Sequence, residues 1–413
     1  MGNLDSSITS DVYVLGAALP DYDSASGRLA ARSPTGTLFV AKENATWSSI
    51  TYLYSKNDGK TWSQISTGFG TPPTPPPYYQ VQAVAADASE IAYVVFQKYD
   101  NLDDQYGAQQ IYITSYTSGV TMNTQMVSDV GVYQGRAACA LDPINNILHI
   151  VWSNVVDGAR FLCYRHVHTS TNEWSPILTL QAGLSPSIAV SPLDNSIWIA
   201  WKQESGGMCN LMYCQNFMFA DDDSFTASPP YTLNESNTLA QFNGRCSIGV
   251  DSIGHPHVVW DGRNMVEQNF NVYYSSYDGC VWSDPITLNQ EYYSLGHNSS
   301  APTLTIDQHN NINVLWRYAA SSGVYIQGRA LSVYGISDIT SISSTNEVGS
   351  SVRSTTRFAE FPNTAWAVNA IPYYGYAFTY LLYDTSQDSY TLYYETVNLI
   401  WTYSAYRPVF RGS

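Results

Sequence analysis

Residues 244–288 read GRCSIGVDSIGHPHVVWDGRNMVEQNFNVYYSSYDGCVWSDPITL, and this stretch decides the fold. Short apolar runs such as HVVW and NVYYSS alternate with the turn-forming stretches VDSIG, DGRN and YDG. Runs of this length, joined by turns of Gly, Asp and Asn, are typical of antiparallel strands. The stretch therefore predicts a four-stranded antiparallel sheet, and it places the chain in the all-β class.

The same unit recurs along the chain. Units begin near residues 28, 80, 136, 185, 245, 300 and 353, which gives a period of 49 to 60 residues. A period of this size with four short strands per unit is typical of a β-propeller, in which neighbouring sheets stack around an axis. We expect seven four-stranded antiparallel blades. Because the last unit is the most degenerate, six blades plus a terminal segment are the alternative.

The repeat suggests one propeller domain over residues 28–400, followed by a C-terminal tail at 401–413. Residues 1–27 form an N-terminal segment whose run SDVYVLGAAL is a candidate strand. We expect this strand to close the ring by completing the last blade, because that pairing removes an exposed sheet edge. Four second strands end in a tryptophan at equivalent places, namely Trp152, Trp201, Trp260 and Trp316.

Composition excludes some classes of function. The 413 residues include 34 acidic and 18 basic ones, so the net charge of −16 leaves no basic stripe for nucleic acid. No apolar run approaches the roughly 18 residues of a membrane span, and the N-terminus lacks the pattern of a classical signal peptide. Six scattered cysteines read as free, mostly buried thiols. No metal-ligand or nucleotide-binding pattern is complete, so no cofactor and no metal are expected.

One turn carries a family resemblance. Residues 55–62 read SKNDGKTW, which resembles the Asp-box or BNR repeat, S-x-D-x-G-x-T-W, of sialidase-like propellers. A weaker version, SSYDGCVW, spans residues 275–282. In that family the Asp-box is structural and lies away from the active site. The resemblance therefore implies a sialidase-like propeller and a scaffold role for Ser55, Asn57, Gly59, Trp62, Ser275, Gly279 and Trp282.

Four arginines share one position of the repeat and suggest a site on the axis. Sialidases hold a sugar carboxylate with three arginines at the centre of one face. Here the first strands of alternate units open on an arginine, at intervals of 108 or 109 residues, and these are Arg28, Arg136, Arg245 and Arg353. Inner strands line the channel of a propeller, so these guanidinium groups could converge on an anion or glycan. The alternative is that each one bonds the next blade and is structural.

The catalytic set of the family, a tyrosine nucleophile with a glutamate and an aspartate, is not assignable among 33 tyrosines. We therefore expect a non-catalytic, lectin-like propeller with a glycan-recognition or structural role. Its partner would be a cell-surface glycan or glycoprotein, at an extracellular or virion surface. One such setting is a phage tail or neck appendage, which would contact other virion proteins and serve host recognition. The alternatives are a sialidase-type exo-glycosidase and an assembly or docking protein that binds no glycan.

Overall fold

The structure is a computed structural model of the whole chain. It describes residues 8–18, 29–43, 49–57, 59–67, 78–99, 109–117, 120–129, 133–156, 158–205, 208–219, 225–233, 238–240, 246–264, 269–289, 298–306, 310–320, 323–332, 335–337, 339–341, 352–353, 375–384 and 389–399. In some of these strands only the backbone is described. Within these ranges the regular structure is all β, and no helix there is long and apolar enough to cross a membrane.

The described strands form seven antiparallel sheets, which we number in chain order. The first sheet holds β2 (Ala30–Arg32), β3 (Leu38–Glu43), β4 (Ile50–Ser55) and β5 (Ser63–Thr67). The second holds β6 (Tyr78–Ala86), β7 (Ala92–Tyr99), β8 (Gln109–Thr117) and β9 (Val120–Met126). The third holds β10 (Tyr133–Asp142), β11 (Ile147–Val156), β12 (Ala159–His168), β13 (Glu173–Trp174) and β14 (Leu178–Ala182).

The next three sheets each contain one strand that is split into two pieces, so they count five strands. The fourth holds β15 (Leu184–Val190), β16 (Ile197–Ser205), β17 (Met208–Phe219), β18 (Phe225–Ala227) and β19 (Tyr231–Thr232). The fifth holds β20 (Thr238–Ala240), β21 (Cys246–Val250), β22 (Pro256–Asn264), β23 (Asn271–Ser276) and β24 (Ile286–Thr287). The sixth holds β25 (Asn298–Ile306), β26 (Ile312–Ala320), β27 (Gly323–Ser332), β28 (Gly335–Ile336) and β29 (Thr340–Ser341).

The seventh sheet joins the two ends of the chain. Its order is β1-β32-β31-β30, with β1 (Ile8–Ala18), β32 (Ser389–Leu399), β31 (Gly375–Asp384) and β30 (Val352–Arg353). β1 runs antiparallel to β32, from the pair Ile8 and Leu399 to the pair Ala18 and Tyr390. The N-terminal strand thus covers what would otherwise be an open edge. The predicted domain boundaries, and the count of seven blades for the whole ring, stay predictions.

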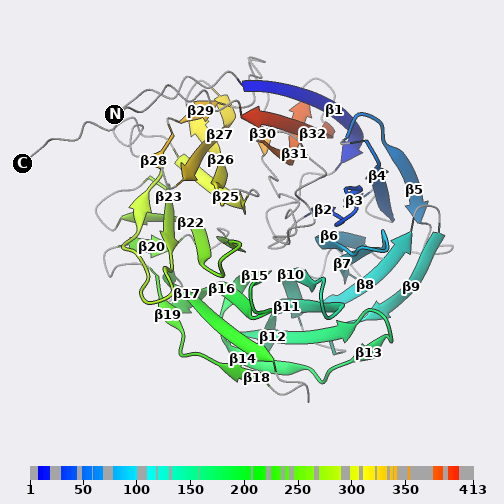
Figure 1. Cartoon of the computed structure of the whole chain (residues 1–413), viewed down its shortest axis with the longest axis horizontal. Helices are drawn as coiled ribbons and strands as arrows, with labels where there is room; N and C mark the ends of the chain where they lie inside the picture. Colours follow the sequence, from blue (N-terminus) through cyan, green and yellow to red (C-terminus); the bar gives the residue numbers. More distant parts are fainter. Residues whose placement is uncertain are drawn as a thin grey trace, which may run out of the picture.

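The sheets follow one another around a central axis in Figure 1, where the first strands β2, β6, β10, β15 and β25 lie nearest the centre and the last strands β5, β9, β13 and β18 lie at the rim. This arrangement confirms the predicted all-β propeller. The expectation that four tryptophans end second strands is wrong, because each strand continues four residues beyond its tryptophan. These tryptophans are nevertheless at most 1% exposed, and buried side chains of adjacent sheets form common clusters. One such cluster joins Ala200 and Cys214 of the fourth sheet to Ile248 and Trp260 of the fifth. The core therefore lies between the blades.

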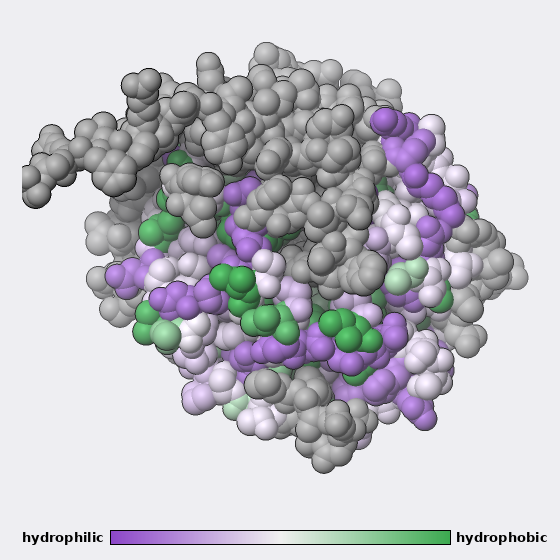
Figure 2. Space-filling view, viewed as in Figure 1, coloured by the Kyte–Doolittle hydropathy of each residue, from purple (hydrophilic) through white to green (hydrophobic). Residues whose placement is uncertain are grey.

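The part of the surface that the structure describes carries few large hydrophobic side chains. Figure 2 shows the hydrophobic residues of one face as small patches among hydrophilic ones, over the lower half of the ring. Among the described residues the exposed large hydrophobic side chains are Met126, Ile144, Leu193, Ile253, Val281, Ile286 and Ile336. Five cysteines are described, and all are free thiols; only Cys280 is exposed.

The turn between the first and second strands has the same construction in six units. An Asp or Ser opens it in the units whose opening residue is described, and a residue in the left-handed region ends it. The left-handed residues have φ between 56° and 98° and are Gly36, Glu90, Asn146, Asn195, Gly254 and Asn310. Gly and Asn suit this conformation best, so the turns predicted from stretches such as VDSIG follow from local chemistry.

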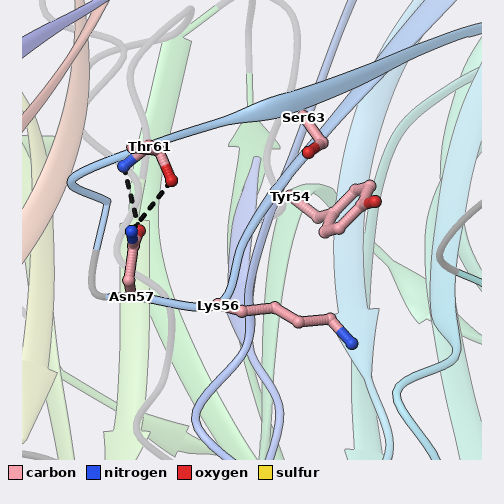
Figure 3. Close-up of a pocket in the computed structure, with 5 residues that line it drawn as sticks. All are labelled: Tyr54, Lys56, Asn57, Thr61 and Ser63. Atoms are coloured by element: carbon pink, nitrogen blue, oxygen red, sulfur yellow. Dashed lines mark hydrogen bonds between the residues drawn. The ribbon is translucent and has the colours of Figure 1, made fainter.

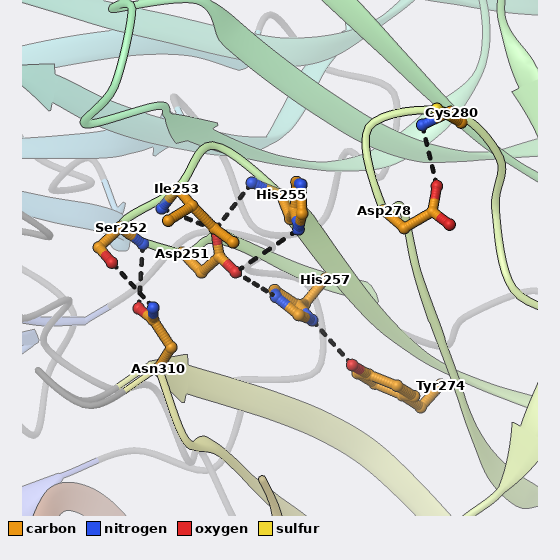
Figure 4. Close-up of polar contacts among 9 residues, drawn as sticks. All are labelled: Asp251, Ser252, Ile253, His255, His257, Tyr274, Asp278, Cys280 and Asn310. Carbon is orange, nitrogen blue, oxygen red and sulfur yellow. Dashed lines mark hydrogen bonds and ion pairs between the residues drawn. The ribbon is translucent and has the colours of Figure 1, made fainter. Parts of the chain in front are cut away.

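Asp251 shows how such a turn is held (Figure 4). Its Oδ1 accepts the backbone N–H groups of Ile253 and His255 at 3.1 and 2.8 Å, and its Oδ2 lies 3.5 Å from His257 Nε2. The Nδ1 atom of His257 is 2.7 Å from the hydroxyl of Tyr274. Burial alone would raise the pKa of Asp251, but the hydrogen bonds from His257, His255 and Ile253 outweigh it and lower the pKa.

Replacing the Asp251 carboxylate should lower the stability of the protein, by an amount that depends on pH. We expect Asp251→Asn to lower the free energy of unfolding by about 1–3 kcal/mol at pH 7, because the buried carboxylate accepts several hydrogen bonds. The folded-state pKa lies below the unfolded value of about 4, so the stabilisation is present above that value. It is lost as pH falls through the folded pKa, and the difference between the two proteins should shrink there. Urea unfolding at several pH values measures this.

The exposed Asp284→Asn is the matched control and should change stability little at any pH. A difference between Asp251→Asn and the natural protein that stays constant from neutral to acid pH would contradict the assignment.

Candidate functional site

The two faces of the ring are built differently. Because neighbouring strands are antiparallel, the first–second and third–fourth turns of every sheet lie on one face, which we call the turn face. The first strands begin on the opposite face. There the pairing of four inner strands slips by one residue, in β6 between Val81 and Ala83, and at equivalent places in β10, β15 and β25. These slips are β-bulges, so we call this side the bulge face.

The bulge has a strained backbone. Arg136, Ser185 and Ala301 occupy equivalent positions in three sheets, and each has φ of 51°. Residues with a side chain rarely adopt this left-handed conformation, which persists only where the surroundings enforce it. In the third sheet, Arg136 and Ala137 both lie between the pairs Gly135–Ser153 and Ala138–Val151, so two residues of β10 stand opposite one residue of β11. Bulges of this kind redirect side chains and are frequent beside functional sites.

Hydrogen bonds across the seams between sheets hold these bulges. Oxygen atoms of one sheet accept the N–H of the bulge in the next: Gln82 Oε1 from Ala137 at 3.2 Å, and Ser153 Oγ from Ser185 at 3.2 Å. Asp261 Oδ2 accepts the N–H of Ala301 at 2.9 Å. At the first seam, Glu43 accepts the N–H of Val81. We call the residues that bond across the seams here the polar belt: Glu43, Gln82, Arg136, Ser153, Ser185, Lys202 and Asp261.

A buried ion pair lies within this belt. Lys202 Nζ is 2.7 Å from Asp261 Oδ1, and the two side chains are 0% and 1% exposed. Lys202 belongs to β16 and Asp261 to β22, so the pair joins the fourth sheet to the fifth. The nearby Cys246 is fully buried, and burial raises the pKa of its thiol to about 12 although the charge of Lys202 acts in the opposite direction. This thiol is therefore neutral and unreactive at physiological pH.

Lys42, next to Glu43 at the end of β3, has a lowered pKa. Burial lowers the pKa of Lys42 to about 8, although the neighbouring carboxylate of Glu43 partly opposes the shift. A lysine with such a pKa is neutral in part near physiological pH and can then accept a proton. Perturbed groups of this kind are common at functional sites, so Lys42 marks the same region as the bulges.

Buried amides support the bulge of the second sheet. Gln82 Nε2 donates to Gln80 Oε1 at 3.2 Å, and the hydroxyl of Tyr99 donates to the same oxygen at 2.7 Å. Gln97 in turn donates to Gln109. The four glutamines are at most 4% exposed. A connected network of this kind fixes the orientation of Gln82, which accepts the N–H of Ala137 in the next sheet.

The four predicted arginines are placed unequally. Arg28 and Arg245 lie outside the described residues, and only the backbone of Arg353, in β30, is described. Arg136 is partly exposed and donates to the hydroxyl of Ser185 in the next sheet. This contact across the seam is of the kind that the structural alternative predicts. The convergence of the four side chains on one anion stays a prediction.

The two turns that resemble Asp-boxes lie on the turn face. In the first, Asn57 Oδ1 accepts the N–H of Thr61 and the hydroxyl of Ser55, both at 2.9 Å, and Ser55 Oγ accepts the N–H of Gly59 at 2.9 Å. Gly59 has φ of 82°, as such a tight turn requires. Beside this turn is an open pocket of about 300 Å³ (Figure 3), lined by Tyr54, Lys56, Asn57, Thr61 and Ser63.

The second turn is closed differently. Tyr277 stands at the place of Asn57, and the next residue supplies the carboxylate, since Asp278 Oδ1 accepts the N–H of Cys280 and of Val281 at 2.9 Å each. Ser275 Oγ donates to the carbonyl of Ser283 at 2.8 Å. Trp282 packs beside Trp198 of the fourth sheet, at the seam between blades. The Asp-box assignment itself stays a prediction for both turns.

Sequence reasoning missed the bulges and the Lys202–Asp261 pair. The signal for the pair was present, because the residue after each second-strand tryptophan is polar or charged, as in Ser153, Lys202, Asp261 and Arg317. Which of these meet across a seam depends on the order of the sheets, which the spacing alone does not give. Among the described residues, no group of three or more His, Cys, Asp or Glu side chains could hold a metal ion.

No protein-family profile matches the chain, and no curated protein matches it either. Solved structures do. An ulvan lyase of polysaccharide lyase family PL25, bound to a saccharide, has 9% identity and a TM-score of 0.58, with 93% of this chain and 95% of that chain covered. An α-L-arabinofuranosidase from Fusarium graminearum has 12% identity and a TM-score of 0.50, with 81% and 99% covered.

A sialidase of Trypanosoma rangeli also matches, with 10% identity, a TM-score of 0.46, and 77% of this chain and 58% of that chain covered. The ulvan lyase and the arabinofuranosidase, whose TM-scores are 0.58 and 0.50, support the β-propeller fold of this chain. At these identities the similarity concerns the fold alone, and the roles of individual residues do not transfer.

The buried pair gives a test of how the seam is held. Asp261→Ala leaves the Lys202 charge buried and the N–H of Ala301 without this acceptor, so we expect a loss of about 3–5 kcal/mol in the free energy of unfolding. The double variant Lys202→Met, Asp261→Asn removes both charges and keeps an acceptor for Ala301. It should be more stable than Asp261→Ala, as measured by urea unfolding. A double variant less stable than Asp261→Ala would show that the charges stabilise the seam directly.

Proposed function

We propose that this protein is a non-catalytic glycan-recognition propeller, which binds an anionic group of a saccharide on the bulge face beside Arg136. One observation carries the proposal: Arg136 is partly exposed, its backbone is left-handed at a bulge, and its guanidinium donates to Ser185 of the next sheet. A guanidinium offers paired donors that match a carboxylate or a sulfate.

The support around Arg136 suits binding. Gln82 accepts the N–H of Ala137, the residue after Arg136. Ser153 accepts the N–H of Ser185, and the hydroxyl of Ser185 in turn accepts the hydrogen bond from Arg136. A side chain that is already held in place loses little conformational entropy when a ligand arrives. The net charge of −16 repels polyanions at long range. Physiological salt screens this repulsion, so the local contact with Arg136 decides whether an acidic saccharide binds.

The similar solved structures support a saccharide ligand. The ulvan lyase and the arabinofuranosidase are, by name, enzymes that act on glycans, and their fold covers most of this chain. Propellers host many functions, so this support is an analogy of fold.

The carboxylates of the polar belt favour recognition over catalysis. Glu43 is 2% exposed and accepts the N–H of Val81, while Asp261 is 1% exposed and pairs with Lys202. A general acid or base must reach the substrate within hydrogen-bond distance. Neither carboxylate is exposed enough for that, so we do not assign a hydrolytic role to them.

Binding to acidic polysaccharides tests the proposal. We expect the natural protein to bind polygalacturonate or ulvan in affinity electrophoresis. Arg136→Ala should bind at least about tenfold more weakly, since a charged hydrogen bond contributes about 1.5–3 kcal/mol. Lys56→Ala, which removes an exposed cation of the turn face, is the control and should bind normally. If Arg136→Ala binds the acidic polysaccharide as tightly as the natural protein, the proposed site at Arg136 is wrong.

The rival enzymatic function is tested in the same experiment. A fluorogenic sialoside, and the reducing ends or unsaturated products of the two polysaccharides, report any cleavage. Turnover that is lost in Arg136→Ala would replace recognition by catalysis as the function of this face. A tight protein partner in the absence of any saccharide binding would favour an assembly role.

For the setting we propose an extracellular or virion surface, where low charge, many tyrosines and contact with host glycans occur together. The proposal rests on composition. If the protein lies on a virion surface, antibodies against it should label intact virus particles in electron microscopy. Labelling only after the particles are disrupted would contradict it.

A further inference from the structure

Four aromatic rings meet on the turn face, at the seam between the fourth and fifth sheets. Tyr277 lies at the centre, with ring centroids 5.7 Å from Trp198, 5.7 Å from Tyr231 and 5.6 Å from Trp282. Trp282 in turn lies 6.3 Å from both Trp198 and Tyr231. The rings come from β16, from β19 and from the turn after β23, so two blades contribute to one group.

The four rings differ in exposure. Trp198 is 4% exposed and forms the base of the group, whereas Tyr231, Tyr277 and Trp282 are partly exposed. The backbone fixes the outer rings, because Tyr277 and Trp282 form an isolated β-bridge across their turn. We call Tyr231, Tyr277 and Trp282 the aromatic platform.

The turn does not need the ring of Tyr277. In the first sheet the equivalent residue is Asn57, whose side chain closes the turn by accepting the N–H of Thr61. In the fifth sheet Asp278 closes the turn instead, because its Oδ1 accepts the N–H groups of Cys280 and Val281. A partly exposed aromatic residue therefore occupies a position where the same turn is built elsewhere from a small polar side chain.

The rim of the platform is polar and acidic. Asp278 is exposed, and its Oδ2 points away from the two backbone donors that its Oδ1 accepts (Figure 4). Val281, at 63% exposure, adds an apolar edge. Residues 225–233 and 275–289, which build the platform, contain no Lys or Arg. This chemistry disfavours an anionic ligand and suits a neutral one that has both an apolar face and hydroxyl groups.

We propose that the aromatic platform binds a neutral saccharide, whose pyranose face packs on the rings of Tyr277 and Tyr231 while Asp278 accepts its hydroxyl groups. Rigid aromatic rings provide apolar contact at little entropic cost, and their polar tips bond the hydroxyl groups at the edge of the sugar. This site lies on the face opposite Arg136 and takes uncharged sugars. It does not depend on the anion site proposed above.

Binding to neutral polysaccharides tests the platform. The probes are dextran, arabinan, galactomannan and mixed-linkage β-glucan, in affinity electrophoresis and by the change in tryptophan fluorescence that Trp282 should report. We expect at least one probe to bind, and Tyr277→Ala to weaken its binding about tenfold. Tyr277→Phe keeps the ring and should bind within about twofold of the natural protein, because stacking uses the ring and not the hydroxyl.

The controls separate binding from folding. Tyr112→Ala removes a partly exposed tyrosine that stacks on Phe96 in the second sheet, outside the platform, and should bind the neutral probe normally. Tyr231→Ala is the second platform variant if Tyr277→Ala does not fold, as judged by urea unfolding, and should show the same loss. Arg136→Ala should bind the neutral probe normally.

Two results would overturn the proposal: no neutral probe binds, or the folded platform variants bind as tightly as the natural protein. The two sites fail separately. Loss of neutral binding with acidic binding intact removes only the platform, and the reverse result removes only the anion site at Arg136.

Discussion

The seam between neighbouring sheets is the constraint on which this structure depends. Second strands such as β11 and β22 bury apolar side chains on both faces, and their tryptophans, Trp152 and Trp260, are 1% exposed. A sheet of this kind cannot be stable alone, because each face must be removed from water by a neighbour. A ring satisfies that requirement for every sheet at once, and the repeat in the sequence is the means of building it.

The same seams determine where function can reside. Packing large aromatic side chains between blades leaves the inner strands close together, and their bulges expose N–H groups that the next blade must accept. Gln82, Ser153 and Asp261 do so. Polar groups that stabilise the ring are thus gathered beside its axis and locked in orientation, which is also what a binding site requires. The binding site proposed on the bulge face would therefore use the same contacts that stabilise the ring.

The sequence was sufficient for the fold because strand length, turn chemistry and period are local properties. The turn of Asp251 and the start of each unit could be read directly. The candidate site could not, for physical reasons. A one-residue slip in pairing leaves no mark in composition, so the left-handed backbone of Arg136 was invisible. Lys202 and Asp261 are 59 residues apart, and only the stacking of two blades brings them to 2.7 Å. The aromatic platform likewise forms from two units.

The pairing of β1 with β32 has a consequence for how the protein is made. Contacts between residues 8–18 and 389–399 are the most distant in sequence that the fold contains among its described strands. During synthesis the six central sheets can form one after another, but the strand made first must wait for the strand made last. Until then its edge is open to other chains. The ribosome must therefore synthesise the chain as far as residue 399 before the ring can close, and during this interval the protein is most exposed to misassembly.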